Sequence, residues 1–277
     1  MKMFSSAGRR ALTPVLAMFA FAACDDSTGV GSPQSVALNF QVGTASGPQM
    51  SGPARADGPV RVAGPPMIID GTNGTLTIEE IRLIVAEVEL DGEDDACEDD
   101  EPNSDDCADF EAPPRFLDLP LDGEPVQAFA GLIPPGVYDE LEFEIEDLED
   151  DEDDTQFAAE IAALRDQILV EFPDWPRKAT ALVVGTFESQ AGSMDFSVYL
   201  EAEIEVERNL VPPLIVGEEG STGTDLTVDI RPDIWFTRSD GSVLELHLYD
   251  YGTTGLVLEF EFEMEDGVLE VEIDDDN

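Results

Sequence analysis

Apolar and acidic residues alternate along several stretches of this chain, and no other feature constrains its fold as strongly. Successive side chains of a β-strand point to opposite faces, so this alternation is typical of a strand with one buried face and one face in water. Four stretches, 137–146, 194–207, 256–265 and 268–273, place glutamates opposite the apolar residues. The sequence therefore predicts a sheet protein with a strongly acidic outer surface.

The apolar side of these stretches is expected to form the core. It comprises Val137, Leu141, Phe143 and Ile145, then Val198, Leu200, Ala202, Ile204 and Val206, and finally Leu256, Leu258, Phe260, Phe262 and Met264. The outward side comprises Tyr138, Glu140, Glu142, Glu144 and Glu146, then Tyr199, Glu201, Glu203, Glu205 and Glu207, and finally Glu259, Glu261, Glu263, Glu270 and Glu272. Other runs predict strands at 35–42, 67–69, 76–90 (with a break near Glu79 and Glu80), 115–119, 125–130, 179–189, 226–230 and 243–249. Asp266-Gly267 predicts a hairpin between the last two stretches.

The charge balance limits what the chain can bind. It has 13 Lys and Arg against 63 Asp and Glu, a formal net charge of −50 at pH 7. A field of that sign repels phosphate backbones and anionic lipid headgroups, so we expect no nucleic-acid partner, whereas cations and basic partners are favoured. Hydrophobic residues make up 42% of the chain and follow a pattern, which predicts a folded protein despite the acidity.

One amphipathic helix is predicted at 154–173. Phe157, Ile161, Leu164, Ile168 and Phe172 recur at helical spacing, Asp154 or Thr155 could cap the start, and Pro173 ends the helix. Many short strands and a single helix favour a mainly β protein, an antiparallel β-sandwich. The helix would connect a first half at 35–153 with a β-rich second half at 178–273, packed on the first.

The first residues look like an export signal. Lys2, Arg9 and Arg10 precede an apolar run that ends in small residues and Cys24, an order typical of secretory signals. The cysteine after small residues resembles a bacterial lipobox. This predicts a signal peptide at 1–23, a lipid on Cys24, a flexible tether at 24–34, and attachment to a membrane of the cell envelope without spanning it. The alternative is a signal cut nearby, with Cys24 an ordinary thiol.

Acidic inserts at 91–111 and 147–154 are candidate cation sites. In an exported protein Cys97 and Cys107 are expected to form a disulfide within the first insert. Because Ca²⁺ prefers clustered carboxylates, its candidate ligands are Asp94, Asp95, Asp99, Asp100, Asp151 and Asp153. The second insert fails the EF-hand pattern, since Gln156 and Ala162 stand where Gly and Glu are needed. The alternative is a solvated acidic loop.

The glutamate faces of the strands raise the same question. Like charges directly opposite on paired strands destabilise a sheet by roughly 0.2–1 kcal/mol per pair. If any two such faces pair, high salt, bound Ca²⁺ or splaying into water could offset the repulsion. The hypothesis is that salt or Ca²⁺ stabilises the fold; the alternative is a solvated face that serves solubility.

Signals for catalysis are weak. His247 is the only histidine and lies in a predicted strand without a nucleophile elbow, and phosphate-loop and zinc-helix motifs are absent. Trp175, Trp235, Tyr249 and Tyr251 could form a sugar platform or belong to the core. We therefore predict a non-catalytic structural or binding module whose partner is a glycan or another envelope protein. A carbohydrate-binding surface module is the second interpretation, and a hydrolase the third.

Four motifs in order carry a family resemblance: Leu76-Thr77-Ile78-Glu79-Glu80-Ile81-Arg82, Val88-Glu89-Leu90, Phe116-Leu117-Asp118-Leu119 and Ile133-Pro134-Pro135-Gly136-Val137-Tyr138. Together they resemble an uncharacterised domain of exported bacterial lipoproteins. The resemblance spans about 35–147 and implies a transthyretin-like or similar Greek-key β-sandwich in the envelope. It implies no catalytic residues. The Gly- and Pro-rich loop at 43–66 and the cysteine-bearing insert depart from the pattern.

Overall fold

The computed structural model describes residues 33–43, 64–92, 109–148, 157–217, 223–259 and 268–275, with the backbone alone for the last segment. All of them belong to one compact unit, 31–277. The candidate residues Cys24, Cys97, Cys107, Asp94, Asp95, Asp99, Asp100, Asp151 and Asp153 lie outside the described residues.

Strands form most of the described chain. Their bounds are β1 Gln34–Val42, β2 Met67–Gly71, β3 Gly74–Val85, β4 Glu87–Gly92, β5 Asp109–Ala112, β6 Arg115–Asp118, β7 Val126–Ile133, β8 Gly136–Ile145, β9 Ala181–Ser189, β10 Gly192–Glu201, β11 Ile204–Val216, β12 Thr224–Ile230, β13 Leu258–Glu259 and β14 Val268–Asp275. The helices are α1 Ala158–Glu171, α2 Pro232–Trp235, the 3₁₀ turn η2 Leu246–Tyr249, and α3 Tyr251–Thr254. The prediction of a mainly β protein is confirmed.

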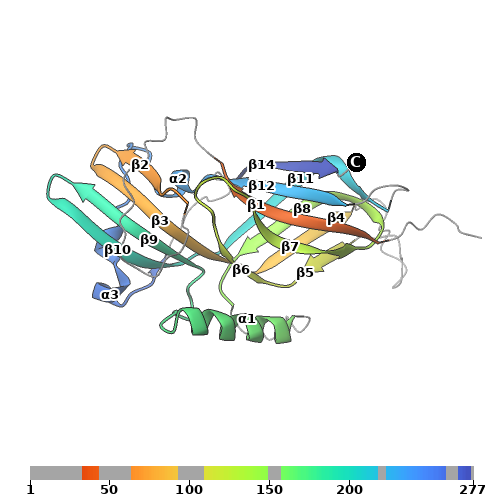
Figure 1. Ribbon diagram of the computed structural model, residues 1–277, viewed down its shortest axis with the longest axis horizontal. Helices are drawn as coiled ribbons and strands as arrows, with labels where there is room; N and C mark the ends of the chain where they lie inside the picture. Colours follow the sequence, from red (N-terminus) through yellow and green to blue (C-terminus); the bar gives the residue numbers. More distant parts are fainter. Residues whose placement is uncertain are drawn as a thin grey trace, which may run out of the picture. The chain divides into compact units, whose positions relative to one another are not determined.

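The strands form three sheets (Figure 1). Sheet A has the order β14-β12-β1-β7, sheet B has the order β13-β10-β9-β3-β2 with β6 also on β3, and sheet C has the order β11-β8-β4-β5. The pairs β1–β12 and β10–β13 are parallel, and the other pairs are antiparallel. Strands from before and after α1 are neighbours in every sheet, so the two predicted halves interleave.

Sheets A and C face each other across a common core. Phe40 of β1 meets Phe143 of β8 edge to face, with ring centroids 5.0 Å apart, and Phe110 of β5 lies 5.1 Å from Phe129 of β7. All but one of the predicted inward residues of β1, β8, β11 and β12 are buried, the exception being Val137; the buried ones are Val36, Leu38, Phe40, Val42, Leu141, Phe143, Ile145, Ile204, Val206, Leu226, Val228 and Ile230. This arrangement is consistent with the predicted β-sandwich.

Two predicted long strands instead bend from one sheet into the next. The stretch 76–90 does not break at Glu79, where the pairing of β3 with β9 shows only a register shift; it breaks at Ala86, where β3 of sheet B gives way to β4 of sheet C. The stretch 194–207 breaks at Ala202 and Glu203, between β10 and β11. Apolar alternation continues through each bend because the core is continuous, so the sequence pattern does not mark the change of sheet.

Helix α1 confirms the predicted helix and its inward residues but not its cap, and its outer side is not purely polar, because Leu169 and Val170 are exposed. Ile168 is buried, and Ile161, Leu164 and Phe172 pack partly buried against the cluster that contains Ile84 of β3. The helix begins after Phe157, which provides no side-chain cap, so the predicted caps Asp154 and Thr155 are wrong. Figure 1 shows α1 beside β6. Within the described residues, no helix combines the length and apolar character that crossing a bilayer requires.

Two outward tyrosines of the prediction are buried. Tyr138 is fully buried and its hydroxyl donates to the Pro134 carbonyl at 3.0 Å, while Val137 is exposed. The cause is a register shift after Tyr138, where β8 has one residue more than β4. This extra residue inverts the alternation of inward and outward side chains along β8. Tyr199 is buried because Trp175 and Tyr251 cover the outer face of β10 there.

The C-terminal predictions are corrected as well. Residues 243–249 do not form a strand: Val243 makes a single bridge to Thr237, and 246–249 form η2, which packs on β9 and β10. Of the predicted last hairpin, β13 pairs with β10 in sheet B and β14 pairs with β12 in sheet A, while residues 260–267, which include the predicted turn at Asp266-Gly267, lie outside the described residues. The apolar alternation predicts strands in this region, of which 258–259 and 268–275 are described, but it carries no information on their partners.

Candidate functional site

Sheet C presents acidic residues on its outer side in direct register. Glu87, Glu89 and Asp91 of β4 lie opposite Glu144, Glu142 and Glu140 of β8. On the other side of β8, Glu205 and Glu207 of β11 lie opposite Glu144 and Glu142. On the other side of β4, Glu111 and Asp109 of β5 lie opposite Glu89 and Asp91. We call these residues the carboxylate face.

The core forces this arrangement. The alternate residues of the same strands, among them Val88, Leu90, Leu141, Phe143 and Val206, are buried beneath the sheet. Burying them turns the intervening acids outward, and the strand register then places acid against acid. Side chains directly opposite lie about 5 Å apart at Cβ, and each like-charge pair costs roughly 0.2–1 kcal/mol.

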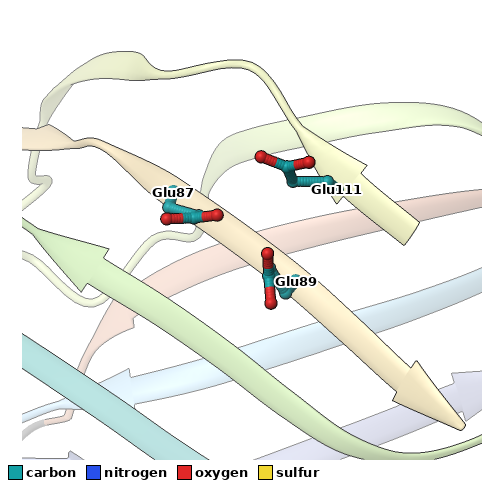
Figure 2. Close-up of side chains that lie close together, drawn as sticks. All are labelled: Glu87, Glu89 and Glu111. Atoms are coloured by element: carbon teal, nitrogen blue, oxygen red, sulfur yellow. The ribbon is translucent and has the colours of Figure 1, made fainter. Parts of the chain in front are cut away.

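Three groups of carboxylates on this face approach closely enough to share a cation. They are Glu87, Glu89 and Glu111; Glu89, Asp91 and Glu142; and Glu142, Glu205 and Glu207. Within each group, one ligand oxygen from every residue lies within 4.8 Å of the others. Two oxygens that each bind Ca²⁺ at about 2.4 Å can be no farther apart than that. Figure 2 shows the first group, in which the carboxyls of β4 and β5 extend from the same side of the sheet.

Burial, together with the crowding of like charges, raises the pKa of several of these acids. Burial raises the pKa of Glu87 from 4.5 to about 8, helped by a hydrogen bond with Glu89 and by the charges of Glu89, Glu144 and Glu111. Burial also raises the pKa of Glu142 to about 7, helped first by the charge of Glu205. Glu144 shifts in the same direction for the same reasons. Glu87, Glu142 and Glu144 therefore hold protons more tightly than isolated glutamates do, and a bound cation would relieve the repulsion that contributes to these shifts.

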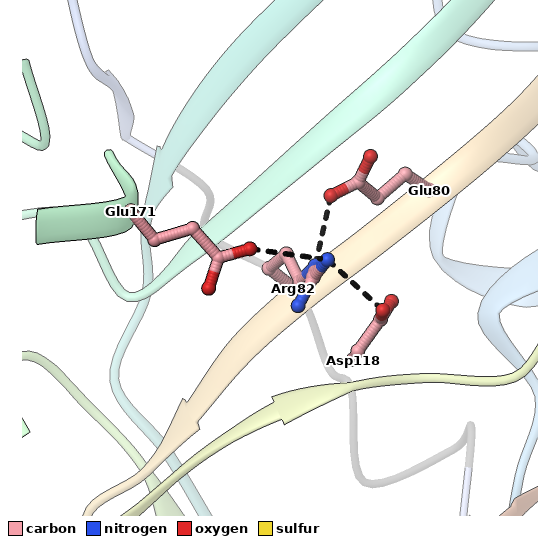
Figure 3. A network of polar contacts seen from close by, with 4 residues as sticks. All are labelled: Glu80, Arg82, Asp118 and Glu171. Atoms are coloured by element: carbon pink, nitrogen blue, oxygen red, sulfur yellow. Dashed lines mark hydrogen bonds and ion pairs between the residues drawn. The ribbon is translucent and has the colours of Figure 1, made fainter. Parts of the chain in front are cut away.

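A second acidic cluster, on sheet B, contains its own base. The Arg82 side chain on β3 is 9% exposed; its Nε donates to Glu80 Oε1 at 2.8 Å, and its Nη2 lies 2.9 Å from Asp118 Oδ2 and 3.6 Å from Glu171 Oε1 (Figure 3). Its guanidinium also lies 5.7 Å from the centre of the Phe172 ring. Glu171 is in the last turn of α1, so this network attaches the helix to the sheet.

The sequence anticipated part of the carboxylate face and missed the rest. The glutamates of β8 and β11 were predicted to point outward, and those on the described strands do. The sequence analysis assigns no glutamate face to β4, because it predicts 76–90 as one strand. It places Asp109 and Glu111 of β5 within the candidate cation insert 91–111, but it names other residues of that insert as the ligands. The alternation of Glu87, Val88, Glu89, Leu90 and Asp91 was the available signal.

The predicted sugar platform is not brought together. Trp235 is 4% exposed and packs in the main core near Phe236. Trp175 and Tyr251 both meet Tyr199 edge to face, in a separate cluster. Tyr249 is partly exposed on η2. These four residues therefore do not line one surface.

His247 and one small internal cavity lie apart from the carboxylate face. The imidazole of His247 stacks on Phe187 with ring centroids 4.9 Å apart and planes 7° apart. A cavity of about 10 Å³ lies among apolar side chains, including Ile81, Val183 and Trp235. Its size admits about one water molecule.

Comparison with known proteins adds no information on the function of this site. No family model matches this chain, and no curated protein or solved structure matches it. The resemblance to a lipoprotein domain stays a prediction.

Proposed function

We propose that this chain is an exported, lipid-anchored protein of the bacterial cell envelope, a non-catalytic β-sandwich module whose carboxylate face takes up divalent cations such as Ca²⁺. The observation that carries the cation part is the register of sheet C, which sets glutamate against glutamate across β5, β4, β8 and β11. The N-terminal signal and Cys24 support export and anchoring.

The chemistry of the face fits hard cations. Its groups offer carboxylate oxygens, which Ca²⁺ prefers, and they are half-exposed, so water can complete a coordination shell of about six to eight ligands. Bound cations would offset the repulsion between glutamates on paired strands, which the buried residues of the same strands hold in register. Cation uptake and fold stability are therefore coupled at this surface.

Calorimetric titration of the mature chain with CaCl₂ tests the proposal. The double variant Glu89→Gln/Glu142→Gln removes one ligand from the first and third groups and two from the second. We expect heat of binding for the wild type and its loss in this variant. Asp195→Asn/Glu188→Gln is the matched control, since it removes equal charge from exposed positions on sheet B.

Two outcomes would contradict the cation proposal. If the control variant lost the heat of Ca²⁺ binding to the same extent, the heat would come from general screening of the net charge and not from the carboxylate face. Binding that survives in the face variant and disappears in Asp99→Asn/Asp100→Asn would place the cations in the insert. The anchor is tested separately: labelled palmitate should enter the wild type, and equal labelling of Cys24→Ser would end the lipoprotein part.

A further inference from the structure

The outer surface of sheet C changes character along β8 and β11. At one end it carries the carboxylate face. At the other end Val137 of β8 and Ile215 of β11 lie directly opposite each other, with 44% and 49% of their surfaces exposed. Val211, in the irregular part of β11, is 88% exposed. An apolar end thus continues a charged face on the same two strands.

The core does not need these exposed residues. Tyr138, Leu214 and Val216 are the buried residues of this end, and they fill the interior. Val137 is outward because of the register shift that turned Tyr138 inward. Exposed apolar residues gathered beside a polar surface mark interaction sites more often than isolated ones do.

We propose that this two-part surface docks a segment of another protein that carries basic side chains followed by apolar ones. The basic side chains lie over the carboxylate face and the apolar ones over Val137 and Ile215. This inference rests on the proposed role as a binding module and names the partner of the same site.

Charge selects the occupant. A second copy would bring the same acidic face and a net charge of −50, so it is repelled. An anionic lipid surface is disfavoured for the same reason, whereas lysine and arginine complement the face. Glu144 and Val137 lie seven positions apart on β8, roughly 20 Å at the rise of a strand, which a short extended segment can span.

Fluorescence anisotropy with two labelled peptides tests this. In the first peptide lysines alternate with threonines and then valines alternate with threonines; in the second, serines replace the valines. Both carry equal charge. We expect the valine peptide to bind the mature chain about tenfold more tightly than the serine peptide, from the apolar surface removed from water.

The preference should disappear in Val137→Ser/Ile215→Ser. It should fall several-fold in Val211→Ser, whose side chain is too exposed to matter for folding. It should survive in Ile68→Ser, a control residue on β2 with 48% exposure.

The remaining outcomes overturn the inference. Equal binding of both peptides would mean that only the charge of the surface contributes to binding. Failure of both peptides to bind would mean that the surface does not dock such a segment. Binding that appears only after deletion of 44–63, which contains Arg55 and Arg61, would make this chain its own occupant. Ca²⁺ titration of the same samples separates the two proposals, because cation uptake without peptide preference overturns this inference alone.

Discussion

Sheets B and C handle acidic side chains in opposite ways. On sheet B, Glu80, Asp118 and Glu171 gather around the guanidinium of Arg82, which is nearly buried. On sheet C, the residues directly opposite Glu142 and Glu144 are other glutamates. In the first cluster the positive charge of Arg82 offsets the carboxylates. In the second we infer that bound protons or dissolved cations offset them. We therefore expect the first cluster to serve the fold and the second to make the stability of the fold depend on pH and on dissolved cations.

Removal of Arg82 gives the largest expected effect. Arg82→Met leaves three carboxylates facing each other and leaves Glu171, in the last turn of α1, to oppose the helix dipole. Breaking a buried ion pair costs about 3–5 kcal/mol, and the partners here are partly exposed, so we expect a loss of about 3 kcal/mol in the free energy of unfolding. Urea denaturation measures it.

Arg238→Met is the control, since Arg238 is exposed and its loss should stay within about 0.5 kcal/mol. The ring centroids of Trp175 and Phe172, next to α1, are 5.7 Å apart. The fluorescence of Trp175 should therefore also change in Arg82→Met if the helix detaches. A loss similar to that of the control would mean that Arg82 is not what neutralises this cluster.

The pH dependence of stability is the second test. The pKa of Glu87 is raised to about 8 and that of Glu142 to about 7, from an ordinary value of 4.5. The folded state thus binds protons more tightly than the unfolded state. Its stability is highest near or below the ordinary pKa and falls as the pH rises through the raised values. With solvent screening allowed for, we expect a decrease on the order of 1–2 kcal/mol from about pH 5 to about pH 8.

Calcium should act mainly at the alkaline end of that range, because the raised pKa values keep Glu87 and Glu142 protonated at the acidic end. Melting temperatures measured at both pH values, with CaCl₂ and with NaCl of equal ionic strength, separate binding from screening. An equal effect of Ca²⁺ at both pH values would show that the raised pKa values and the cation site are unrelated.

The sequence predicted the local patterns of this fold well. Alternation identified β1, β12, most of β8 and the first part of β11 together with most of the residues buried there, because burial on one face of a strand is a property of neighbouring residues. Helical spacing identified α1 through Ile161, Leu164 and Ile168 for the same reason. The outward glutamates of β8 and β11, half of the candidate site, came from that same pattern.

Pairing could not be read from the sequence. Alternation gives no partner, so neither the parallel pair β1–β12 nor the placement of β4 between β8 and β5 was predictable. The register shift that buries Tyr138 depends on how β11 and β4 align with β8. Residues 246–249 look like a strand but form η2, because tertiary packing on β9 and β10 overrides a short apolar run.

Two single substitutions sharpen the contrast between the sheets with the smallest effects. Glu142→Gln removes a charge that lies opposite both Glu89 and Glu207, so at about pH 8 without divalent cations it should stabilise the fold by about 1 kcal/mol. Glu80→Gln weakens a charge-assisted bond to Arg82, so it should destabilise the fold by about 1 kcal/mol. The same chemical change therefore has opposite signs on the two sheets. Urea denaturation of both variants decides, and a shared sign would show that neighbouring charges do not distinguish the clusters.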